Sequence, residues 1–62
     1  MRKFRNYQGM KATIKSLVTG KYHIKITDCK GGVIVNKTVD SEDKIGGVLN
    51  RHGDGIWIET AT

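Results

Sequence analysis

The chain lacks most of the features that staple, anchor or export a small protein. Its 62 residues contain one cysteine, Cys29, so no intramolecular disulfide can form. No apolar run approaches the ~18 residues of a membrane span, and no apolar stretch follows the basic N-terminus as it would in a signal peptide. We therefore expect no membrane partner, and the lone thiol favours a reducing, cytoplasmic location.

Patterns typical of catalytic or metal sites are also lacking. The candidate metal ligands are Cys29, His23, His52 and scattered carboxylates, and none has the spacing of a known metal motif. Cys29 lies in a predicted turn with no histidine near it in the sequence, and the glycines match no phosphate-binding motif. A core this small leaves little room for a small-molecule pocket. We predict a protein that is not an enzyme, with no catalytic residues, no metal site and no cofactor.

What the chain does have is positive charge, and this charge is segregated along the sequence. Residues 1–37 hold nine Lys or Arg and one acid, a net charge of +8. Residues 38–62 hold two basic residues and five acids, a net charge of −3. Clustered like charge raises the local concentration of the opposite charge, so the first part of the chain predicts a negatively charged partner.

The alternation of residues 10–28 predicts a β-hairpin with a definite register. A three-residue loop, Val18-Thr19-Gly20, puts glycine at the position that needs a positive φ. Facing residues then agree in character, as in the pair Ile14 and Ile24, whereas a one-residue slip would turn every side chain to the other face. The hairpin therefore has one apolar face and one basic face.

The rest of the chain supplies a third strand, a helix and a last strand. A third strand over residues 33–39 is predicted with Val35 opposite Ile26, and with Val33 and Val39 also on the apolar face. Residues 41–51 carry an apolar stripe at helical spacing, and residues 56–60 read as the last strand, with Ile58 on the apolar face. The Gly pair at 46–47 opposes the helix at about 1 kcal/mol per glycine relative to alanine.

These elements predict an α+β fold: a small antiparallel β-sheet in the order β-β-β-α-β, with the helix covering the apolar face. The last strand is expected beside the strand at residues 10–17, which would place Trp57 on the basic face. If the glycine pair breaks the helix, the alternative is an all-β, SH3-like small barrel. Residues 1–9 are interpreted as a basic flexible arm, and residues 10–62 as a single small β-rich domain.

The basic sheet face and the arm form the candidate functional surface. Lysines on an exposed sheet beside an aromatic side chain are typical of proteins that bind DNA or RNA. We predict a small nucleic-acid-binding accessory or regulatory protein, possible as a homodimer. The alternative is a protein-binding inhibitor or adaptor that docks an acidic surface or adds a strand to a partner's sheet. The candidate binding residues are Arg2, Lys3, Arg5, Lys11, Lys15, Lys21, His23, Lys25 and Trp57.

Overall fold

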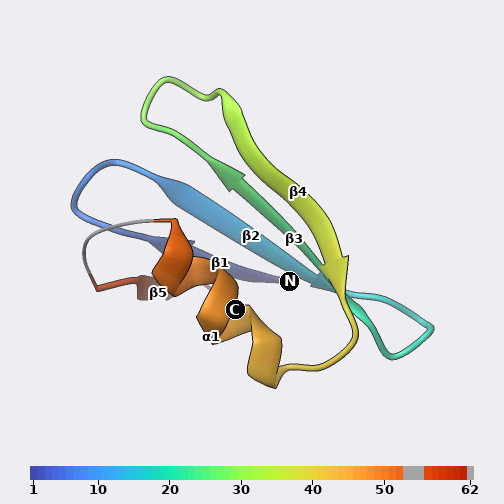
Figure 1. The fold of residues 1–62 in the computed structure, drawn as a ribbon. Helices are drawn as coiled ribbons and strands as arrows, with labels where there is room; N and C mark the ends of the chain where they lie inside the picture. Colours follow the sequence, from blue (N-terminus) through green and yellow to red (C-terminus); the bar gives the residue numbers. More distant parts are fainter. Residues whose placement is uncertain (53–55, 62) are drawn as a thin grey trace.

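The computed structural model describes residues 1–52 and 56–61, which form a five-stranded antiparallel sheet with one short helix lying across one face (Figure 1). The elements in chain order are β1 (Arg2–Arg5), β2 (Lys11–Ser16), β3 (Tyr22–Thr27), β4 (Val33–Val39), α1 (Asp43–Arg51) and β5 (Ile58–Ala61). The strands lie in the order β4-β3-β2-β1-β5, and over the described residues the sheet is not closed into a barrel. The predicted α+β class is confirmed and the barrel alternative is wrong.

The hairpin of β2 and β3 has the predicted register. Ile14 pairs with Ile24 and Ala12 with Ile26, and all four side chains are buried under α1. In the turn, the Leu17 N–H donates to the Lys21 carbonyl oxygen at 2.8 Å, and Gly20 has a φ of 86°. The alternation of apolar and polar residues therefore decides which face of the hairpin is buried.

Strand β4 pairs with β3 through Ile26 and Val35, as predicted, but the end of the strand near the turn differs. The turn is shorter than expected, because the Asp28 N–H donates to the Gly32 carbonyl oxygen at 2.8 Å and closes a three-residue loop. A bulge between Ile26 and Thr27 absorbs the extra residue and pairs Thr27 with Val33. Val33 is consequently 55% exposed, and its predicted place on the apolar face is wrong.

The helix forms despite the glycine pair at 46–47. Ile45, Val48 and Leu49 are all buried against the sheet, as the apolar stripe predicts. Burying three such side chains contributes about 1.5–3 kcal/mol each, which outweighs a penalty of about 1 kcal/mol for each of two glycines. The helix begins at Asp43 rather than at residue 41, with Glu42 in the N-cap position and no side-chain cap. From the sequence, Gly53 is expected to end the helix, and this residue lies outside the described residues.

The N-terminal segment is a strand, so its interpretation as a flexible arm is wrong for residues 2–5. Strand β1 pairs with β2 on one side and β5 on the other. Phe4 lies opposite Ala12 and packs against the core, which offsets the entropy lost by ordering the segment. The following turn is held by Asn6, whose Oδ1 accepts the N–H groups of Gln8 and Met10 at 3.1 and 3.0 Å.

The last strand lies beside a different neighbour from the one predicted. Because β1 is antiparallel to both β2 and β5, β5 runs in the same direction as β2, as a crossover through α1 requires. It pairs with β1, however, and not with the hairpin strand β2. Ile58 therefore lies opposite Arg5 and is 55% exposed, so its predicted burial under the helix is wrong.

Candidate functional site

The face of the sheet opposite α1, here called the open face, gathers basic side chains from three neighbouring strands. Residues that lie directly opposite in an antiparallel pair share a face, so the registers of β1, β2 and β3 fix which side chains these are. The five cations on this face, here called the open-face cations, are Lys3, Arg5, Lys11, Lys15 and Lys25. All of them are exposed.

No carboxylate of a described strand residue shares the open face. Glu59 lies opposite Phe4 and so belongs to the helix side of the sheet. Asp40, which follows β4, forms an ion pair with Lys44 at 2.7 Å, and the hydrogen bond from Lys44 holds the pKa of Asp40 below its ordinary value. Asp28 is occupied in the β3–β4 turn, where its Oδ1 accepts the N–H groups of Lys30 and Gly32. The open-face cations therefore keep their positive field.

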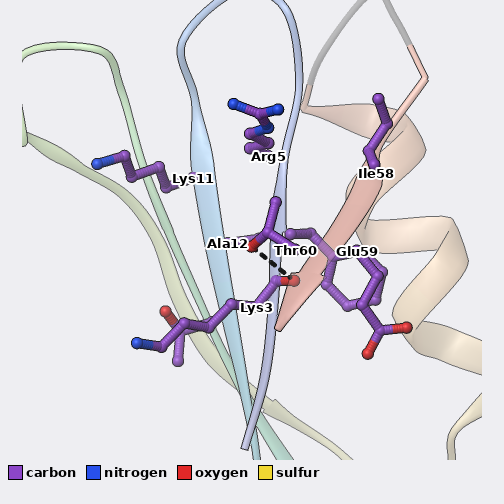
Figure 2. A pocket seen from close by; sticks show the side chains of 9 residues that line it. Lys3, Arg5, Lys11, Ala12, Ile58, Glu59 and Thr60 are labelled. Atoms are coloured by element: carbon purple, nitrogen blue, oxygen red, sulfur yellow. Dashed lines mark hydrogen bonds between the residues drawn. The ribbon is translucent and has the colours of Figure 1, made fainter. Parts of the chain in front are cut away.

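A groove of about 600 Å³ opens on this face where β1 lies between β2 and β5. Figure 2 shows Lys3 and Arg5 reaching from β1 and Lys11 from β2, with Ile58 and Thr60 contributed by β5. The Thr60 hydroxyl donates to the Lys3 carbonyl oxygen at 3.4 Å, which ties the two strands together beneath the groove. The groove thus combines cations, hydroxyls and an apolar side chain. Glu59 also lines it, but its carboxylate is paired with Arg2 at 3.0 Å.

Two further predicted residues lie at the side of the open face nearer β4. His23 lies opposite Thr38 and its Nε2 is hydrogen-bonded to Asn36 Oδ1 across the strands. Lys21 precedes β3 and is exposed, and its charge contributes to the lowered pKa of Asp40. Lys21 thus belongs to a mixed-charge margin and not to the centre of the face.

Arg2 does not lie on the open face. The sequence analysis placed it on the basic surface, and this placement is wrong. It lies opposite Ile14, on the helix side of β1. Its guanidinium forms ion pairs with Glu59 at 3.0 Å and with Glu42 at 3.4 Å, and it lies 5.1 Å from the ring centre of Phe4. The hydrogen bond from Arg2 lowers the pKa of Glu59. Arg2 therefore joins β1, β5 and the start of α1.

Trp57 is also on the helix side, so its predicted place beside the lysines is wrong. Its indole Nε1 donates to the Leu49 carbonyl oxygen at 2.7 Å, and the ring packs against the core. This bond satisfies a carbonyl group in the last turn of α1. Trp57 therefore connects the last turn of α1 to the segment before β5, on the side of the sheet away from the open-face cations.

Two apolar residues near the groove were not identified from the sequence. Tyr7, in the β1–β2 turn, is 79% exposed, and together with Arg5, Asn6 and Ile58 it lines a smaller depression next to the groove. The sequence does hold a signal for Tyr7. It stands two residues before Gly9, which ends the turn with a φ of 85°, and a turn position indicates an exposed side chain. For Ile58 no such signal exists, because its face depends on which strand β5 joins.

The described residues hold no group of three or more His, Cys, Asp or Glu side chains that could bind a metal ion. No described helix is long and apolar enough to cross a membrane. Comparison of the chain with protein-family models, with curated proteins and with solved structures gives no match. The open face and its groove are therefore the features from which a function can be argued.

Proposed function

We propose that this protein binds nucleic acid on the open face of its sheet, without catalysing a reaction. The observation that carries the proposal is the set of open-face cations, which are exposed and share their face with no described strand carboxylate. Phosphate backbones offer regularly spaced negative charge, and lysine and arginine neutralise it with release of counterions. A sheet face with cations on three adjacent strands matches such a partner in sign and in extent.

The polar neighbours of these cations support the same partner. Thr13 lies on the open face between basic residues, opposite Lys3 of β1 on one side and Lys25 of β3 on the other. Hydroxyl groups commonly donate hydrogen bonds to phosphate oxygens, where they set the position of the protein on the backbone. The proposal places the protein in a reducing compartment, the cytoplasm, where the exposed free thiol of Cys29 would persist.

Gel-shift titrations with single-stranded DNA, duplex DNA and RNA, each at two salt concentrations, test the proposal. The double variant Lys15→Glu, Lys25→Glu reverses two open-face charges and should weaken binding while leaving thermal melting nearly unchanged. Lys37→Glu is the control, because Lys37 is exposed on the helix side of neighbouring β4. A lack of retardation at low salt with all three nucleic acids would end the proposal.

A second candidate function rests on the edge strand β4. It is the longest strand, it has no neighbour on its outer side among the described strands, and Val33 and Ile34 are exposed on it. Unpaired edges accept strands from other chains. We propose that, if nucleic acid does not bind, β4 pairs with a strand of a protein partner, a second copy included. Sedimentation equilibrium tests the homodimer, and a monomer at all concentrations argues against self-pairing.

A further inference from the structure

The groove and the smaller depression adjoin each other, because Arg5 and Ile58 line both. Towards β2, the wall of the groove carries Lys3 and Lys11. Towards the β1–β2 turn, the smaller depression is lined by Tyr7. The combined surface therefore begins with basic side chains and ends with an exposed aromatic ring.

Tyr7 and Ile58 form the apolar end of this surface. Tyr7 is 79% exposed and Ile58 is 55% exposed, and both are close to the guanidinium-bearing Arg5. The other described aromatic residues, Phe4, Tyr22 and Trp57, pack against the core on the helix side. Phe4 also lines the groove, but its ring packs against the core. Tyr7 is a largely exposed aromatic residue that lines a depression together with the open-face cation Arg5.

This combination distinguishes between forms of nucleic acid. A duplex presents phosphates to a protein surface but keeps the faces of its bases stacked inside, so an exposed tyrosine gains little from it. A single strand presents phosphates and unstacked base faces together, and proteins hold it with a basic groove and aromatic side chains. Charge alone favours the duplex, because its charge density is higher. A preference for single strands therefore requires contact with the bases.

We propose that the groove between β2 and β5 binds single-stranded nucleic acid, with phosphates against Lys3, Arg5 and Lys11. One base lies against Tyr7 at the end of the groove, and Ile58 forms the apolar floor under it. This inference rests on the proposed nucleic-acid function and adds to it the form of the ligand and the part of the open face that contacts a base.

The test compares binding of a fluorescein-labelled single-stranded oligonucleotide with binding of a duplex that has the same number of phosphates, by fluorescence anisotropy at low salt. Tyr7→Ala should weaken binding of the single strand by about 5- to 150-fold, the range that base–aromatic stacking spans, and should leave duplex binding within about twofold. Tyr7→Phe keeps the ring and should restore single-strand binding. Melting curves verify that each variant is folded.

Ile58→Ala has a matched control at the other edge of the sheet. Ile34 is 45% exposed on β4, at the opposite edge of the sheet from β5, so Ile34→Ala removes the same atoms far from the groove. Ile58→Ala should weaken binding of the single strand several-fold, and Ile34→Ala should change it by less than twofold.

The outcomes separate the two proposals. The groove is supported as the base-contacting site if the protein prefers the single strand, if Tyr7→Ala loses this preference, and if Ile34→Ala keeps it. Equal binding of single strand and duplex, unchanged in Tyr7→Ala and Ile58→Ala, overturns this inference and leaves phosphate binding by the open face standing. No binding of either nucleic acid overturns both.

Discussion

The salt dependence of binding tests whether the open face itself, and not the net charge of the protein, binds the ligand. The perturbation is Lys25→Gln, which removes one open-face cation on β3 without introducing a negative charge. Its partner variant is Lys37→Gln on β4. Lys25 lies opposite Asn36 and Lys37 lies opposite Ile24, so the two lysines are on neighbouring strands and on opposite faces. Both are exposed, and both substitutions change the net charge by one.

The magnitude follows from the number of cations that contact phosphate. For a single strand, log K falls with log salt at a slope of about −0.7 for each phosphate neutralised. If all the open-face cations take part, the slope is about −3.5, and affinity falls about 130-fold between 50 and 200 mM salt. With Lys25→Gln the slope becomes about −2.8, and the same change in salt lowers affinity only about 50-fold.

The assay is a set of anisotropy titrations with one oligonucleotide at four or more salt concentrations between these limits. Lys37→Gln should keep the slope of the unmodified protein, because its ammonium group lies on the helix side of the sheet. If both variants reduce the slope equally, binding follows the total charge of the protein and the argument from the open face is refuted. If neither variant changes it, the cations on β3 take no part in binding.

Three further predictions concern the fold. Ile24 is fully buried, so Ile24→Ala should cost about 2–5 kcal/mol of a total stability of about 3–9 kcal/mol, and the midpoint of urea denaturation should fall sharply; an unchanged midpoint would contradict the observed packing. Gly20→Val should lower the melting temperature more than Thr19→Val, because only position 20 has a positive φ; equal effects would argue against the three-residue loop. Glu59 has a pKa lowered by Arg2, so it stabilises the fold above the ordinary glutamate pKa of about 4.3, and this contribution disappears as the pH falls through the lower folded value. Melting temperatures from pH 7 to pH 2 should therefore fall less steeply for Glu59→Gln than for the unmodified protein, and parallel curves would show that the Arg2 pair has no effect.

The hairpin could be predicted in detail because two independent signals agreed. The alternation of apolar and polar residues has a period of two, so a register that is wrong by one residue puts lysines under the helix. The only glycine near the centre of that alternation is Gly20, and its observed φ of 86° is the one the loop requires. Pattern and turn chemistry thus left one register for β2 and β3.

Strand β1 was missed although the sequence does contain a sign of it. Gly9, Gly20 and Gly31 recur every eleven residues, and all three have a φ between 85° and 89°. Each ends a three-residue loop of the same kind, in which the glycine N–H donates to the carbonyl oxygen three residues before it. The residues around these glycines differ from loop to loop, so the recurrence is not visible as a sequence repeat. When the loops are aligned on their glycines, the loop at Gly9 predicts a strand before it, just as the loop at Gly20 follows β2.

The position of β5 could not be obtained in the same way. Its residues show the period of a strand, but which face each side chain takes depends on the strand beside it. With β1 absent from the predicted sheet, β5 was set beside β2, which placed Trp57 among the lysines. The observed pairing of Ile58 with Arg5 reverses this arrangement. An error in one strand therefore put the wrong aromatic residue into the predicted nucleic-acid-binding surface.

The basic segment of β1 shows why the sequence charge overstates the charge of the open face. Arg2, Lys3 and Arg5 are close in sequence, but alternation sends Arg2 to the helix side and the other two to the open face. On the helix side, carboxylates of β5 and of the residue before α1 are within ion-pairing distance of Arg2, and it becomes a structural residue. Lys3 and Arg5 form no ion pair with a described residue, so their charge is available to a ligand. Under the proposed function, strand parity decides which of these residues contacts the ligand. Substitutions at Arg2 should lower the melting temperature, whereas those at Lys3 and Arg5 should weaken nucleic-acid binding.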